Sequence, residues 1–160
     1  MVDQNFRNLD TIFQETINQY NYSSNLFDSL ESKTNTLLVS ISIIFVISLN
    51  SYFLTKIENS LLIISVMYYI GMTLILISFI ILLNLRKHKF KVIKIDDIKK
   101  SYIEEPNKNF QKIIINKYIP IIDENLNRYD LKNSNLMIAS LFMKFGLIFI
   151  FVTFVSFILF

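Results

Sequence analysis

The stretch LILISFIILL, residues 74–83, decides the fold, because it holds one polar side chain among ten residues. It lies within 27 consecutive uncharged residues between Glu58 and Arg86. A helix needs about 20 mostly apolar residues to cross a hydrocarbon core of about 30 Å. A buried helix of a soluble bundle would instead show polar residues at every third or fourth position. The stretch therefore predicts a transmembrane helix over residues 61–85.

Two further stretches have the same character. The 22 residues between Lys33 and Lys56 are uncharged, and the 28 residues from Asn133 to Phe160 carry a single charge, on Lys144. Each is long enough to span a bilayer, so we expect further spans near 36–54 and 136–159. The predicted fold class is an all-α integral membrane protein with three transmembrane helices and amphipathic cytoplasmic helical extensions.

The composition of the 160-residue chain supports this class. Hydrophobic residues make up 52% of the chain and charged residues 18%, against about 25% charged residues in an average soluble domain. The chain has no Cys, two Gly and two Pro, which leaves little for a disulfide framework, hairpin turns or phosphate-binding loops. The first 35 residues lack the apolar core of a signal peptide, so the first span is expected to act as an uncleaved insertion signal.

The distribution of basic residues predicts the orientation. Residues 86–135 hold 12 of the 16 Lys and Arg, whereas the short connection TKIENS, residues 55–60, holds only Lys56. Short loops rich in Lys and Arg stay in the cytoplasm. We therefore expect a multi-pass protein of the cell membrane whose N-terminus and 86–135 loop are cytoplasmic and whose C-terminus lies outside.

These boundaries predict four segments. Residues 1–35 form an N-terminal cytoplasmic amphipathic helix, 36–85 the transmembrane hairpin, 86–135 the basic cytoplasmic helical loop and 136–160 the third transmembrane helix. In the first segment, one helical face carries apolar residues at steps of three or four, namely Phe6, Leu9, Phe13, Ile17 and Tyr20. Such spacing indicates an amphipathic helix. We expect it to continue into the first span, with an interruption around 21–24 as the alternative.

The basic loop is predicted to contain two helices. The first covers 90–104, with Ile95, Ile98 and Tyr102 on one side. The second begins near Pro106, because proline is well tolerated in the first turn of a helix. Pro120 is expected to kink this second helix, since a proline removes one hydrogen bond and clashes with the preceding turn.

Reactive side chains form no catalytic or metal-binding pattern in the sequence. The single His, His88, lies within the basic run RKHKFK. The acidic pairs 96–97, 104–105 and 123–124 are adjacent in sequence, so on a helix their two members point about 100° apart. An active site needs convergent groups. We therefore expect no enzyme activity, no cofactor, no metal and no direct binding of nucleic acid.

The most specific polar feature is a run of basic residues directly after the second span. This basic cluster comprises Arg86, Lys87, Lys89, Lys91 and Lys94. It stops translocation and sets the topology, or it binds anionic phospholipids, and the two roles are compatible. Basic residues beside a span attract anionic lipid by about 1 kcal/mol each. Lys144, about 12 Å inside the third span, is a further lipid-binding candidate whose side chain either snorkels to the headgroups or faces a polar interior.

Small residues recur at every seventh position of two spans. They form the small-residue seam, which comprises Gly71, Ser78, Ala139, Gly146 and Thr153. In lipid, small side chains allow the close approach of helix backbones on which association depends. We predict that the seam packs the subunits of an oligomer, with packing inside one subunit as the alternative.

The layout resembles the SLATT-like and Pycsar-type small transmembrane effectors of prokaryotic immune systems. Their shared plan is a helix that runs into a two-span hairpin, with a charged residue just before the first span. Here that stretch reads SLESKTNTLLVSISIIF, residues 29–45, with Lys33 as the charge. A third span after a helical insert, residues 107–160, is similar to some members. The membrane effectors of short Argonaute systems are of this general kind.

The resemblance implies a toxin-like protein that oligomerises on a signal and depolarises the membrane during antiviral defence by abortive infection. The predicted function is accordingly a non-enzymatic membrane effector that binds anionic phospholipids, assembles into a homo-oligomer such as a tetramer, and disrupts the membrane through a pore or through disordered lipid. Its signal would come from an operon-encoded sensor protein. Two alternatives remain: a membrane anchor or subunit of a larger complex, and a holin-like phage protein.

Overall fold

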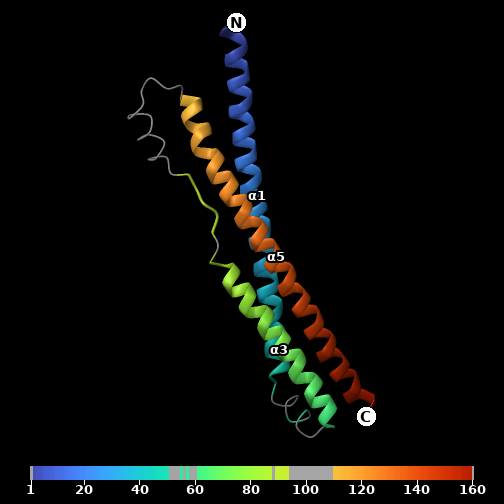
Figure 1. Cartoon of the computed structure of the whole chain (residues 1–160). Coiled ribbons are helices and arrows are strands. Elements are labelled where there is room, and N and C mark those ends of the chain that lie inside the picture. Colours follow the sequence, from blue (N-terminus) through green and yellow to red (C-terminus); the bar gives the residue numbers. More distant parts are fainter. Residues whose placement is uncertain are drawn as a thin grey trace. The chain divides into compact units, whose positions relative to one another are not determined.

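The computed structural model describes residues 2–50, 55, 57, 61–87, 89–93 and 110–159, and these residues contain three long α-helices (Figure 1). Helix α1 is Val2–Ser48, α3 is Leu62–Leu85 and α5 is Phe110–Leu159. Each of the three is long and apolar enough to cross a membrane. The predicted fold class, all-helical with three candidate spans, is confirmed.

Helix α1 runs without a break through the place where an interruption was the alternative. Ser23 donates a hydrogen bond from its hydroxyl to the carbonyl of Tyr20 at 2.7 Å, and Thr16 does the same to Ile12 at 2.7 Å. Because these hydroxyls bond to carbonyls of their own helix, they need no break in the helix to find an acceptor. The amphipathic N-terminal segment and the first span are therefore one helix.

The first predicted span, 36–54, is too long at its C-terminal end. Helix α1 ends at Ser48, Leu49 and Asn50 follow it as a turn, and 51–54 lie outside the described residues. The hydroxyl of Tyr68 on α3 donates a 2.5 Å hydrogen bond to the carbonyl of Ser48. This bond satisfies one of the carbonyls that a helix end leaves without a partner. The second predicted span, 61–85, agrees with α3 to within one residue.

The predicted helix over 90–104 is wrong at its start. Residues 89–93 are not helical, and we call them the strap. Its side chains Val92 and Ile93 are β-branched, which favours extended backbone. The rest of that prediction, with Ile95, Ile98 and Tyr102, lies outside the described residues, and so does Pro106, where the second helix was predicted to begin. Helix α5 continues past Pro120, and the kink there stays a prediction.

The chain forms two compact units, and α1 and α5 contribute to both. Unit 1 comprises Met1–Ser29 and Lys89–Leu131, and unit 2 comprises Leu30–His88 and Lys132–Phe160. The four segments predicted from sequence divide the chain at 35, 85 and 135 instead.

Aromatic rings from three segments pack together in unit 1. Tyr20 of α1 contacts Phe90 of the strap edge to face at 5.4 Å between ring centroids, and Tyr118 of α5 at 4.9 Å. Phe27 contacts Phe90 at 5.4 Å as well. Edge-to-face pairs are favourable beyond the area they bury. Phe90 therefore fastens the strap to the core of unit 1.

Unit 2 buries small and polar side chains together with apolar ones, and it also exposes large apolar side chains. On α3 the buried positions alternate in steps of four and three: Ile64, Tyr68, Gly71, Ile75, Ser78, Leu82 and Leu85. This is the spacing of a left-handed helical bundle. The outer surface carries exposed large hydrophobic residues on all three helices, among them Val46, Ile63, Tyr69, Leu141, Ile148 and Phe151. An apolar exterior around a partly polar interior suits a lipid surrounding.

Candidate functional site

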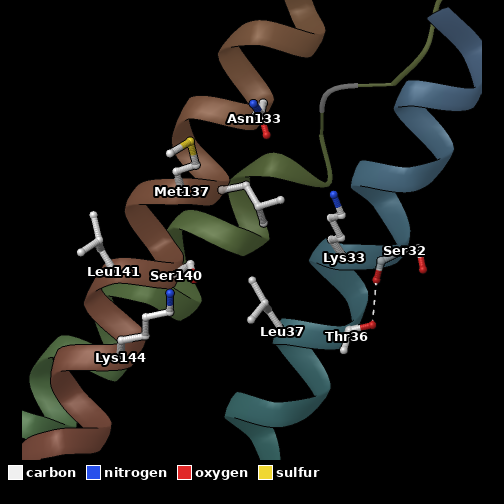
Figure 2. Close-up of a pocket in the computed structure, with 10 residues that line it drawn as sticks. Ser32, Lys33, Thr36, Leu37, Asn133, Met137, Ser140, Leu141 and Lys144 are labelled. Atoms are coloured by element: carbon white, nitrogen blue, oxygen red, sulfur yellow. Dashed lines mark hydrogen bonds between the residues drawn. The ribbon is translucent and has the colours of Figure 1, made fainter. Parts of the chain in front are cut away.

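A groove between α1 and α5 within unit 2 is the principal candidate site (Figure 2). Its volume is about 540 Å³. We call it the two-lysine groove, and its lining residues are Ser32, Lys33, Thr36, Leu37, Asn133, Leu136, Met137, Ser140, Leu141 and Lys144. Residues three and four apart on a helix share a face, which is why the lining residues come from one face of each helix.

Two ammonium groups give the groove a positive charge. Lys33 enters it from α1 and Lys144 from α5, and none of the ten lining residues is acidic. The side chain of Lys144 extends from α5 toward α1 and toward Ser140 (Figure 2). It therefore points toward the N-terminal half of α5, the direction expected of a lysine that snorkels out of an apolar region. Both interpretations of Lys144 from the sequence are compatible with this position, because the groove also contains hydroxyl and amide groups.

Hydroxyl and amide groups add hydrogen-bonding capacity to the groove. Thr36 donates its hydroxyl proton to the carbonyl of Ser32 at 3.0 Å (Figure 2), so its oxygen presents lone pairs to the groove. Ser32, Ser140 and Asn133 line the same space. A lysine ammonium has three donors, and hydrogen bonds between an ammonium and a phosphate or carboxylate are about twice as strong as neutral ones. The arrangement suits an anion.

The structure divides the basic cluster between the two units. Arg86 and Lys87 are exposed in the turn that follows α3, where the Lys87 amide bonds to the carbonyl of Asn84 at 3.2 Å. Lys89 and Lys91 are exposed on the strap in unit 1. Lys94 lies outside the described residues, as does His88. The four described members are close in sequence, but two belong to unit 2 and two to unit 1.

Lys91 is already paired with an acidic residue. Its ammonium lies 2.6 Å from the carboxylate of Glu124, which Arg128 also contacts at 2.6 Å. Arg128 further donates to the carbonyl of Lys89 at 3.2 Å. The hydrogen bond from Lys91, together with the charges of Lys91 and Arg128, lowers the pKa of Glu124. Glu124 thus neutralises part of the positive charge that the sequence assigned to lipid binding.

Asn125 holds the strap more firmly than these surface charges do. It is fully buried in unit 1. Its side-chain oxygen accepts from the Lys91 amide at 2.9 Å, and its side-chain nitrogen donates to the Lys91 carbonyl at 3.1 Å. The amide side chain of Asn125 thereby pairs both backbone groups of Lys91, as a neighbouring strand would do in a sheet. Sequence reasoning missed this residue, because nothing local distinguishes Asn125 from the exposed Asn127 two positions on.

We expect Asn125→Ala to release the strap. The Lys91 amide loses its acceptor, and leaving such a group without its partner costs about 1–3 kcal/mol, which corresponds to roughly 5- to 150-fold faster exchange of that amide. Hydrogen–deuterium exchange of the full chain in detergent measures this directly. Asn127→Ala, an exposed change on the same helix, is the matched control. Unchanged exchange at Lys91 in the Asn125 variant would contradict the role given to the side chain.

All five residues of the small-residue seam are buried in unit 2. Ser78 donates to the carbonyl of Ala139 at 2.8 Å, so α3 and α5 meet there. A Cβ added at Gly71 would lie 2.9 Å from the carbonyl oxygen of Gly146. Thr153 bonds within its own helix, to the carbonyl of Phe149 at 2.9 Å. These contacts favour packing inside one subunit, the alternative from the sequence, and a role of the seam between subunits stays a prediction.

Among the residues that the structure describes, no three His, Cys, Asp or Glu side chains gather as metal ligands would. Compared with known proteins, the chain matches no family model, no curated protein and no solved structure. The likeness in layout to small transmembrane effectors therefore rests on the sequence alone. Within the described part of the chain, the two-lysine groove is the feature with the clearest capacity for a ligand.

Proposed function

We propose that the protein is a non-enzymatic membrane effector that binds anionic phospholipids, assembles into a homo-oligomer and depolarises the membrane. The observation that carries the proposal is that Lys33 and Lys144 line one groove of a unit whose outer surface is apolar. A lysine near the centre of a transmembrane helix costs about 2.5–3.5 kcal/mol on insertion scales. A phosphate bound in the groove offsets this cost, because it gives the Lys144 ammonium group a partner.

The basic cluster supports the same ligand. Arg86, Lys87, Lys89 and Lys91 are all exposed, and each contributes about 1 kcal/mol of attraction when it lies close to an anionic leaflet. Three of the four have no described acidic partner, whereas Lys91 shares Glu124 with Arg128. The cluster draws the chain toward anionic lipid without geometric selectivity, since exposed charges interact weakly and are screened by salt.

Packing inside unit 2 supports the need for several copies. Ile41, Ile75 and Leu82 are fully buried, so side chains fill the interior between the helices. A filled bundle of three helices conducts no ions along its axis. Depolarisation therefore requires an assembly of several chains or a disordered bilayer around them. The exposed apolar faces of the three helices are the surfaces left for contacts with lipid or with other copies.

A role in antiviral defence is supported by the layout resemblance described above. On this proposal the trigger comes from a sensor encoded in the same operon, and the groove and the basic cluster bring the chain to its lipid. A membrane anchor for a larger complex would share the spans and the orientation. It would differ in leaving the membrane potential intact.

Reconstituted vesicles test the effector function. We expect the full chain to dissipate a potassium diffusion potential in vesicles that contain an anionic phospholipid and to leave neutral vesicles polarised. Changing Arg86, Lys87, Lys89 and Lys91 together to Gln should slow dissipation at least about tenfold, given roughly 1 kcal/mol for each exposed basic residue. Lys112→Gln with Lys117→Gln, two exposed lysines of α5 outside the cluster, is the matched control.

Two results would count against the proposal. Equal rates in neutral and anionic vesicles would remove the lipid requirement. An intact potential in every vesicle, at every protein-to-lipid ratio and with any operon partner added, would favour the membrane anchor instead.

Reporter fusions test the orientation. A reporter that is active only in the cytoplasm should be active when fused within 110–130 and inactive after Phe160, because 12 of the 16 Lys and Arg lie in 86–135 and such loops stay inside. A reporter exported to the outside should give the opposite pattern. Cytoplasmic activity after Phe160 would overturn the arrangement with a cytoplasmic N-terminus and three crossings.

A further inference from the structure

We propose that the two-lysine groove selects phospholipids with a phosphomonoester headgroup, such as phosphatidic acid, over anionic phosphodiester lipids. This inference rests on the lipid binding of the proposed function and assigns the lipid class. Charge complementarity is the first argument. Lys33 and Lys144 together carry two positive charges, and no lining residue is acidic. A phosphomonoester carries about 1.5–2 negative charges near pH 7, whereas a phosphodiester carries one and leaves the groove with a net positive charge.

Hydrogen bonding points to the same headgroup. The two ammonium groups have three donors each, and they approach the groove from opposite helices. A phosphomonoester has three terminal oxygens, so beside Lys144 and Ser140, which lie next to each other (Figure 2), it keeps a third acceptor for Lys33 on the opposite wall. A phosphodiester has two terminal oxygens and a substituent on its far side. That substituent would occupy the space that Ser32 and Asn133 line.

The remaining lining suits the lipid rather than free phosphate. Leu37, Met137 and Leu141 form an apolar wall beside the lysines. A second, apolar hollow of about 400 Å³ follows along α1, lined by Leu38, Val39, Ser42, Ile43, Val46 and Ile47. Acyl chains can lie along this exposed apolar face while the phosphate stays in the two-lysine groove. The contact of chains with apolar surface adds about 25 cal/mol per Å² removed from water, a gain that inorganic phosphate lacks.

Native mass spectrometry of the full chain in a non-ionic detergent tests the selection, with phosphatidic acid, phosphatidylglycerol and cardiolipin titrated separately. We expect the first phosphatidic acid to bind about five- to tenfold tighter than phosphatidylglycerol. This ratio corresponds to the free energy of roughly one additional ion pair, about 1 kcal/mol. Lys33→Gln with Lys144→Gln should reduce this ratio to near one, and Lys112→Gln with Lys117→Gln should leave it unchanged. Thermal unfolding by circular dichroism shows whether each variant is folded.

The wild-type chain provides a second measurement that does not depend on the variants. The second ionisation of a phosphomonoester has a pKa of about 6, so the preference for phosphatidic acid should grow between about pH 5 and pH 8. A preference that stays flat over this range would overturn the inference. Inorganic phosphate should not displace the lipid at equal concentration, and displacement would show a soluble ligand instead.

The remaining outcomes separate this inference from the proposed function. Equal affinity for phosphatidic acid and phosphatidylglycerol would overturn the selection and leave general binding of anionic lipid intact. Tighter binding of cardiolipin than of phosphatidic acid would show that the groove recognises two phosphodiesters, and the inference would fall. Failure to bind any anionic lipid would overturn both.

Discussion

Replacing Gly146 with leucine is expected to lower the thermal midpoint of the full chain by at least about 5 °C. A Cβ at this position would lie 2.6 Å from Cγ1 of Ile75 and 2.8 Å from the carbonyl oxygen of Gly71. The Ile75 side chain can move, but a backbone oxygen cannot, so α3 and α5 must separate. Overpacking costs about 1–3 kcal/mol when side chains alone adjust, and separating two helices costs more.

Engineered cysteines report on the same contact. The chain has no Cys, and Ser78 bonds directly to the Ala139 carbonyl, so Ser78→Cys with Ala139→Cys should crosslink α3 to α5 within one chain. Adding Gly146→Leu should reduce this crosslink. Phe145→Leu, an exposed change one residue away, should leave both the crosslink and the thermal midpoint unchanged.

The same experiment decides between the two roles of the small-residue seam. If Gly146→Leu retains wild-type stability and the intrachain crosslink but loses oligomers detected by chemical crosslinking in membranes, the seam joins subunits. Loss of stability together with the intrachain crosslink supports packing inside one subunit. Loss of oligomers in that second case would be a consequence of an altered subunit.

Replacing Lys132 with methionine is expected to raise the thermal midpoint. Lys132 is 3% exposed in unit 2 and lies just before the predicted third span. Methionine is a flexible apolar side chain of similar length. Burial disfavours the charge of Lys132, and Glu31, whose negative charge favours it, is exposed and stays hydrated in the variant. Each kcal/mol gained raises the midpoint of a chain of this size by about 2–4 °C. Lys112→Met, at an exposed position of α5, is the control.

The burial of Lys132 also predicts how the stability of the chain depends on pH. Burial lowers the pKa of Lys132, while the negative charge of Glu31 opposes the shift. The folded chain therefore binds this proton more weakly than the unfolded chain does. Stability should rise with pH between the lowered pKa and the ordinary lysine value of 10.5, because there the unfolded state holds more protons. The rise should be smaller in Lys132→Met, and equal slopes of thermal midpoint against pH would contradict the assignment.

The spans could be predicted from sequence because a bilayer imposes a length and a composition that a local window detects. Residues 61–85 and α3, Leu62–Leu85, differ by one residue. The end of α1 was harder to place. It depends on the hydrogen bond between the Tyr68 hydroxyl and the Ser48 carbonyl, a contact across 20 residues that no local pattern contains. The helix predicted to begin at residue 90 was wrong for a similar reason. The strap is held by Asn125, which comes 34 residues after Lys91 in the sequence.

The candidate site could be predicted only in part. The charge pattern identified Lys144, because a lone lysine in an apolar span is conspicuous in any sequence. The sequence shows Lys33 as the charge before the first span, but its place in the same groove as Lys144 depends on which faces α1 and α5 turn toward each other. The basic cluster was visible as a run, whereas its partial neutralisation by Glu124 required the fold. Nothing in the adjacent pair Asp123-Glu124 indicated that Glu124 would be the one to bind Lys91 and Arg128.

The small side chains between α3 and α5 have a thermodynamic consequence. Glycine and alanine lose almost no rotamer freedom when they are packed, and a serine is a short side chain with little to lose. Bringing the two helices together at Gly71, Ser78, Ala139 and Gly146 therefore orders few side chains. An interface of Leu and Met would immobilise many torsions, and its entropic cost would grow on heating. Helices α3 and α5 should thus stay associated at temperatures at which contacts between longer side chains have already loosened.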